Sequence, residues 1–128
     1  EDGIRDYKVT GVQTCALPIC HEHIDVIAAQ MLQCLYELHK SGYLHGDVNP
    51  KNFRVDSKDG KVYIIDFQLS KEYVTPSGLH VIEEGGVRPL GFLPFISLNQ
   101  HVKRNMSRRD DLEALGYTLL YYLTTYNG

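Results

Sequence analysis

The segment that most constrains the fold is the last apolar stretch of the chain. Ser107 followed by Asp110 resembles a capping box, which marks a helix start. Leucines and tyrosines then cover almost every face of the predicted helix: Leu112, Leu115, Leu119, Leu120 and Leu123, with Tyr117, Tyr121 and Tyr122 between them. A helix of this kind is usually buried. Because the chain ends soon afterwards at Gly128, we expect elements that should cover this helix to be missing and its surface to be partly exposed.

A second helix is predicted from His21 to Lys40. Its apolar residues recur at steps of three and four, which makes one apolar stripe: Ile24, Ile27, Met31, Leu35 and Leu38. Gly42 follows where a left-handed residue commonly ends a helix.

Two short strands are predicted at Phe53–Val55 and Val62–Ile65. Residues 57–61 join them, and the Asp59-Gly60 pair is a strong hairpin signal. Residues 67–98 are rich in Gly and Pro, which predicts a long loop, and long ordered loops are often functional. The predicted fold class is α+β, mainly α.

Composition excludes several classes of partner and site. A net charge of -3 predicts no bulk attraction to nucleic acid or to an acidic membrane. No apolar run approaches the roughly 20 residues that span a bilayer. Cys15, Cys20 and Cys34 have neither metal-ligand spacing nor an even number, so we expect free or buried thiols in a reducing, intracellular compartment.

Residues 1–19 lack helical and strand periodicity, and no basic region precedes an apolar one, which excludes a signal peptide. Back-translated, Glu1–Asp6 and Val9–Ile19 match a common indexed sequencing adapter in one frame, with Tyr7 and Lys8 at its variable index. The segment therefore resembles a translated adapter. We expect it to be non-native and disordered, the alternative being a genuine N-terminal extension.

Three polar side chains are candidates for chemistry. Asp47 and Asn52 lie in one turn-rich segment, and Asp66 follows the strand 62–65. Phosphoryl transfer needs a carboxylate that orients the attacking hydroxyl and oxygen ligands that hold Mg²⁺ on nucleotide phosphates. One Asp in a turn is usually only solvated or capping, but the order His45, Asp47, Asn52, hairpin, Asp66-Phe67 is far more specific.

This order resembles the protein-kinase catalytic loop H-R-D-x-x-x-x-N followed by D-F-G. Further segments are similar to the casein kinase 1 family over essentially all of residues 21–128: Tyr43–Asp47, Asn52-Phe53, Val62–Phe67, Ser97–Asn99 and Ser107–Tyr117. Gly46 is closer to the sister group of vaccinia-related kinases. The resemblance implies that residues 20–128 are a partial kinase domain, namely the core of the C-terminal lobe with its helix, catalytic loop, hairpin, activation segment and central helix.

The resemblance also implies a function. It implies an ATP- and Mg²⁺-dependent serine/threonine protein kinase that acts on a protein substrate inside the cell, with no obligate oligomer. The roles that it implies are these: Asp47 is the catalytic base, Asn49 stands at a catalytic position, Asn52 and Asp66 bind magnesium, His45 packs under Phe67, and Asp111 accepts hydrogen bonds from the catalytic-loop backbone. Arg108 and Arg109 are either an anion or substrate site or a solvated pair beside the helix start.

Four residues depart from the family pattern. Gly46 replaces an Arg that answers a phosphorylated activation loop, so such regulation is not expected. Asn49 replaces a Lys beside the transferring phosphoryl group, and losing one preorganised stabiliser costs roughly 3–4 kcal/mol, about two to three orders in rate. Phe92 replaces a Thr near the catalytic Asp. Gln68 replaces the Gly of D-F-G and should resist positive φ.

These departures leave three readings of the parent protein open: a weakly active kinase, a pseudokinase that binds nucleotide or a partner without turnover, and a pure interaction protein. Neither G-x-G-x-x-G nor Val-Ala-x-Lys occurs in the chain, although a kinase needs both parts. We therefore expect the 128-residue chain alone to be inactive and poorly stable.

Overall fold

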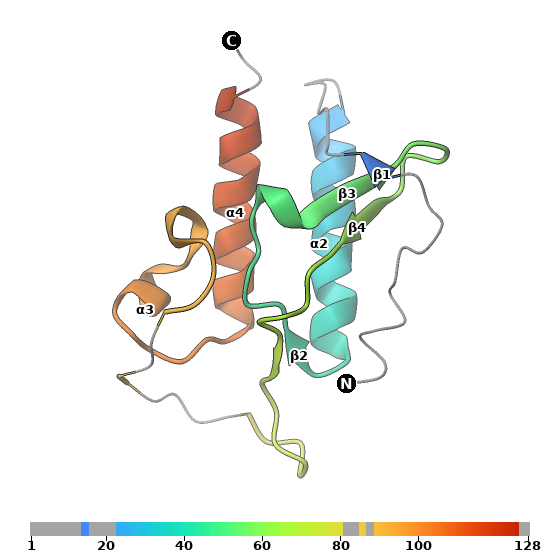
Figure 1. The fold of residues 1–128 in the computed structure, drawn as a ribbon. Coiled ribbons are helices and arrows are strands. Elements are labelled where there is room, and N and C mark those ends of the chain that lie inside the picture. Colours follow the sequence, from blue (N-terminus) through green and yellow to red (C-terminus); the bar gives the residue numbers. More distant parts are fainter. Residues whose placement is uncertain (1–13, 16–22, 81–84, 87–88, 126–128) are drawn as a thin grey trace.

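The computed structural model describes residues 14–15, 23–80, 85–86 and 89–125 (Figure 1). Its helices are α2 (Ile24–Lys40), α3 (Leu98–His101) and α4 (Arg108–Thr125), with 3₁₀ turns η2 (Pro50–Asn52) and η3 (Leu93–Phe95). One antiparallel sheet has the order β1 (Thr14–Cys15), β3 (Phe53–Asp56), β4 (Val62–Ile64), and a second pairs β2 (Tyr43–Leu44) with β5 (Lys71–Glu72). The predicted class, α+β with helices dominant, is confirmed.

Helix α2 confirms the predicted amphipathic stripe. Met31, Leu35 and Leu38 are buried. Of the residues between them, Cys34 is half-buried against the core and the others are exposed. The helix ends where the backbone N–H of Ser41 donates to the carbonyls of Glu37 and Leu38, and Gly42 follows with a φ of 94°. Of the predicted start, residues 21–22 lie outside the described part of the chain.

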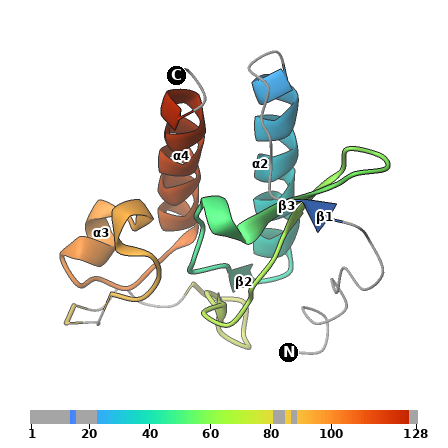
Figure 2. The same ribbon diagram turned by 45° about the horizontal axis from the view of Figure 1, so that its top comes forward.

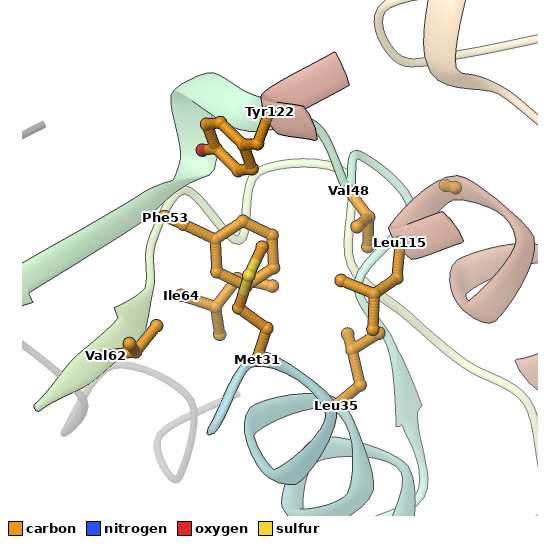
Figure 3. Packing of buried hydrophobic residues seen from close by; sticks show 9 residues of the cluster. Met31, Leu35, Val48, Phe53, Val62, Ile64, Leu115 and Tyr122 are labelled. Atoms are coloured by element: carbon orange, nitrogen blue, oxygen red, sulfur yellow. The ribbon is translucent and has the colours of Figure 1, made fainter. Parts of the chain in front are cut away.

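The hairpin and the two long helices enclose the core (Figure 3). Helices α2 and α4 run antiparallel side by side, and the hairpin lies across α2 with β4 packed against it (Figures 1 and 2). Phe53 pairs with Ile64, and Val55 pairs with Val62, as the Asp59-Gly60 turn predicts. The buried cluster draws on every one of these elements: Met31, Leu35, Val48, Phe53, Val62, Ile64, Ala114, Leu115 and Tyr122.

Helix α4 buries only one of its faces. Leu115, Thr118 and Tyr122 point into the core, whereas Leu112 is 44% exposed and Leu120 is 58% exposed. A helix this apolar is usually buried on nearly every face, but the partial exposure that we expected of it in this chain is what the structure shows. One half of the predicted capping box is found at the start of α4. The Asp110 carboxylate accepts the backbone N–H of Ser107 at 2.6 Å.

The stretch 67–98, predicted to be a loop, contains short regular elements. Strand β5 returns to pair with β2, so that Leu44 lies opposite Lys71 and the ends of the intervening segment are brought together. Turn η3 follows, and α3 begins with a full capping box between Ser97 and Gln100. This layout places Gly91 and Phe92, just before η3, beside Gly46 and Asp47.

Two predictions reach the limits of the described residues. Within residues 1–19 only Thr14–Cys15 is described, as strand β1 paired with Val55 and Asp56 of β3. The rest of the predicted disorder lies outside the described residues. No helix within the described ranges combines the length and apolar character that crossing a membrane requires.

Candidate active site

The buried carboxylate of Asp111 anchors the loop that follows β2. It accepts the backbone N–H of His45 at 2.8 Å and that of Gly46 at 3.1 Å. Nε2 of His39, on α2, lies 2.8 Å from the same carboxylate. Asp111 has no exposed surface, so these contacts replace the water that its charge gives up. One side chain of α4 thereby fixes both the loop and the end of α2.

His45 connects the loop to the end of the hairpin. Its Nδ1 accepts the backbone N–H of Asp47 at 3.1 Å, so the ring proton resides on Nε2, which donates to the carbonyl of Ile65 at 2.9 Å. The edge of its ring meets Phe67 with 5.3 Å between centroids. His45 therefore sets the separation between Asp47 and Asp66, the residue between Ile65 and Phe67.

The Asp47 carboxylate is oriented from three sides. Its Oδ1 accepts from Asn49 Nδ2 at 2.9 Å and from the backbone N–H of Phe92 at 3.1 Å. Its Oδ2 accepts from Asn52 Nδ2 at 3.1 Å. Two of these donors belong to its own loop and the third to the segment before η3. Preorganised hydrogen bonding of this kind holds a carboxylate in one pose toward a reacting group.

The two asparagines of the loop differ in whether the amide oxygen of the side chain accepts a hydrogen bond. Asn49 is 2% exposed, donates twice to Asp47 and accepts the backbone N–H of Lys51 with its Oδ1 at 2.9 Å. Asn52 also donates twice to Asp47. Within the described part of the chain, however, Asn52 Oδ1 has no hydrogen-bond donor, so this oxygen is available to a cation.

An open cleft of about 360 Å³ brings the predicted residues together. It is lined by Asp47, Asn49, Lys51, Asn52, Asp66, Leu69, Gly91 and Phe92. Asp66 enters it with a φ of 62°, a left-handed conformation that is uncommon outside glycine and often marks functional sites. Gln68 has no positive φ, so the strain predicted for Gln68 lies instead at Asp66.

The donor set in the cleft fits magnesium. Asn52 Oδ1 and the exposed Asp66 carboxylate are hard oxygen ligands, and Mg²⁺ commonly takes only one or two ligands from protein while keeping water and phosphate oxygens. Among the residues that the structure describes, no cluster of three or more His, Cys, Asp or Glu side chains could hold a metal.

Comparison with known proteins agrees with this chemistry. The profile of a family described as "Phosphotransferase enzyme family" matches residues 5–71, more than half of the chain. This chain belongs to the phosphotransferase enzyme family. A probable casein kinase I homolog of Encephalitozoon cuniculi is 35% identical over 95 residues, which are 74% of this chain and 30% of that protein. The resemblance to casein kinase 1 is thus confirmed, and the phosphotransferase chain spans about 30% of that relative's length.

The two arginines predicted as a weak anion site do not line the phosphotransferase cleft. Arg108 lies over the ring of Tyr73, with 5.0 Å from its guanidinium carbon to the ring centroid. Arg109 donates through Nε and Nη2 to Asn99 at 2.9 Å once the Asn99 amide oxygen is turned toward it. Both are exposed, and sequence reasoning missed their partners because these lie in distant segments.

Gly46 occupies a conformation that few other residues tolerate. Its φ is 84°, and a Cβ there would lie 2.6 Å from the carbonyl oxygen of Leu69. Gly60 in the hairpin turn has a comparable φ of 70° but open space around its Cβ position. Alanine at either position would adopt a positive φ, but only alanine at Gly46 would also clash with Leu69. Comparing the two variants therefore separates the free energy of the backbone strain from that of the clash.

We predict that Gly46→Ala destabilises the phosphotransferase chain more than Gly60→Ala does. Both variants should lose about 1–2 kcal/mol to left-handed strain, and Gly46→Ala should lose at least about 1 kcal/mol more because Leu69 must shift. Urea unfolding of both variants beside the wild type measures the difference. Equal midpoints would show that Leu69 yields freely.

A second cavity, of about 390 Å³, lies between α2 and β4. Cys34, Leu38, Ile64 and Phe67 are among its lining residues, and Asp47, Asn52 and Asp66 are not. Burial raises the pKa of the Cys34 thiol, with backbone hydrogen bonding acting in the opposite direction. Cys34 is a free thiol kept protonated, which fits packing and not nucleophilic chemistry.

Proposed function

We propose that the chain is the core of the C-terminal lobe of an ATP-dependent serine/threonine protein kinase of the casein kinase 1 type. The observation that carries the proposal is the convergence of Asp47, Asn52 and Asp66 on one cleft, with Asp47 oriented by three donors. A protein substrate inside the cell follows from the same proposal. Nucleic acid, membrane and an obligate oligomer are not part of it.

In the proposed reaction the hydroxyl of a Ser or Thr side chain lies against Asp47. The carboxylate orients this hydroxyl and takes its proton as the oxygen attacks the γ-phosphorus of ATP. The bond from that phosphorus to the bridging oxygen breaks, and ADP leaves. Asn52 Oδ1 and Asp66 would hold Mg²⁺, whose charge would offset that of the phosphate oxygens.

The test is a transfer assay on the complete gene product that contains this chain. We expect label from [γ-³²P]ATP to appear on Ser or Thr of a protein substrate such as casein, only with Mg²⁺ present. Chelation by EDTA should abolish the signal. No transfer to casein or other protein substrates at any enzyme concentration would contradict the kinase proposal.

A pseudokinase is the second candidate, and Asn49 favours it. The side chain at this position is an uncharged amide, so it adds no charge to the cleft, and it is buried and hydrogen-bonded to Asp47 and Lys51. A pseudokinase would bind Mg·ATP without turnover. A rise in melting temperature with Mg·ATP in a preparation that transfers no phosphate would favour this candidate, and no rise at all would leave an interaction protein.

A further inference from the structure

The cleft contains a cation that the resemblance to kinases did not assign. Among its described lining residues Lys51 is the one Lys or Arg, and the carboxylates of Asp47 and Asp66 line the same cleft. The Lys51 side chain is exposed. A lysine among two carboxylates and open space is positioned to meet an anion that enters with a metal ion.

The backbone of Lys51 is held in register with Asp47. Asn49 bridges the two, because its Nδ2 donates to Asp47 Oδ1 and its Oδ1 accepts the Lys51 N–H. Lys51 is also the middle residue of η2, and Asn52, the next residue, bonds to the other carboxylate oxygen of Asp47. The backbone of Lys51 therefore lies between two residues, Asn49 and Asn52, whose side chains both donate to the Asp47 carboxylate.

The side chain of Lys51 is held as well as its backbone. Its Nζ lies 4.6 Å from the centroid of the Phe92 ring, within the range of a cation–π interaction. The backbone N–H of Phe92 donates to Asp47 Oδ1. Phe92 therefore contacts both the Lys51 ammonium group, through its ring, and the Asp47 carboxylate, through its backbone. Phe92 is 40% exposed and stacks on Phe95, which keeps its ring in place.

We propose that Lys51 supplies to the transferred phosphoryl group the positive charge that Asn49 does not, and that the Phe92 ring seats it for this role. The proposal rests on the proposed function. Lys51 would contact the equatorial phosphoryl oxygens while the phosphorus–oxygen bond to ADP breaks and the substrate proton passes to Asp47. Lys51 is not consumed, and Asn49 becomes a positioning residue.

Lys61 offers a matched control. It is another exposed lysine over an aromatic ring, with 5.4 Å from its Nζ to the centroid of Tyr63, but it belongs to the hairpin and does not line the cleft. If Lys51 were only a surface lysine resting on a ring, the two would respond alike to substitution. Three variants therefore test the proposal: Lys51→Gln, Lys51→Arg and Lys61→Gln.

The first readout is kinetic, on the complete gene product. We expect Lys51→Gln to lower kcat about 10²-fold or more with little change in KM for ATP, since the charge acts on the transition state. Lys51→Arg should recover much of the loss, and Lys61→Gln should match the wild type. A wild type that transfers phosphate and a Lys51→Gln variant that equals it would overturn the role of Lys51 and leave the proposed function standing.

The second readout does not need turnover, so it also decides the case in which the proposed function fails. Isothermal titration with magnesium tripolyphosphate should give a Kd about tenfold weaker for Lys51→Gln than for Lys61→Gln, because a charge-assisted contact is lost. Equal Kd values for these two variants would overturn the contact with phosphate. In NMR spectra of the wild type, the ring current of Phe92 should shift the resonances of the Lys51 ε-protons, and Phe92→Leu should remove this shift. If the wild type shows no such shift, the proposed contact between Lys51 and the Phe92 ring is wrong.

Discussion

Replacing Asp47 with alanine should lower the rate of phosphoryl transfer about 10²- to 10⁴-fold, the range that a general base contributes. The variant lacks both the acceptor for the substrate proton and the group that aligns the attacking hydroxyl. Asp47→Asn is the sharper form of the test. It keeps the size of the side chain and one acceptor oxygen, but it cannot take a proton, so a loss of similar size would assign the effect to basicity and not to loop disorder.

The measurement is the initial rate of label transfer from [γ-³²P]ATP by the complete gene product, beside the thermal shift that Mg·ATP produces. The shift should survive in Asp47→Asn, because the proposed Mg²⁺ ligands, Asn52 and Asp66, remain. Asp59→Asn, an exposed carboxylate in the hairpin turn, is the control and should transfer at the wild-type rate. Transfer that is equal in Asp47→Asn and the wild type would remove Asp47 from the mechanism.

The elements that could be predicted from the sequence are those set by local chemistry. The stripe of Met31 and Leu35 determines which face of α2 is buried, and the Asp59-Gly60 pair determines the hairpin turn. The loop proposed to be catalytic could be found because its spacing is specific. Asp47, Asn52 and Asp66 do line one cleft, although 19 positions separate the first from the last.

The parts that could not be predicted depend on partners far apart in sequence. Strand β2 pairs with β5 over two residues on each side, which is too short for a periodic signal. Ser97 Oγ donates to the Asp110 carboxylate at 2.6 Å and so connects the start of α3 to α4. Neither segment alone contains a sequence signal that predicts this contact. The capping box at Ser97 was hidden in a stretch whose glycines and prolines predict a loop.

The sequence predicted which residues line the cleft better than it predicted what each of them does there. Asn49 was predicted to stand at a catalytic position because it replaces a Lys of the family pattern. In the structure its side chain instead joins Asp47 to the backbone of Lys51. Only the structure relates Lys51 to Phe92, because the two are 41 positions apart. The positive φ considered for Gln68 occurs instead at Asp66.

Asp111→Ala should destabilise the chain by about 3–5 kcal/mol, a large share of the 5–15 kcal/mol that separates native from unfolded proteins. The Asp111 carboxylate is fully buried and meets two backbone N–H groups and the His39 ring. Its removal leaves buried donors without an acceptor, and each such group costs about 1–3 kcal/mol.

Asp59→Ala is the matched control, because the Asp59 carboxylate also accepts a backbone N–H, that of Lys61 at 2.8 Å, but does so in water. Its loss should cost no more than about 1 kcal/mol, since solvent satisfies the freed donor. Urea unfolding followed by circular dichroism measures both variants, and the amide resonances of His45 and Gly46 report whether the catalytic loop stays attached to α4. If the two variants unfold at the same urea concentration, burial of Asp111 does not hold the loop, and the order of the catalytic segment must come from Asn49, Asn52 and Phe92 at its other end.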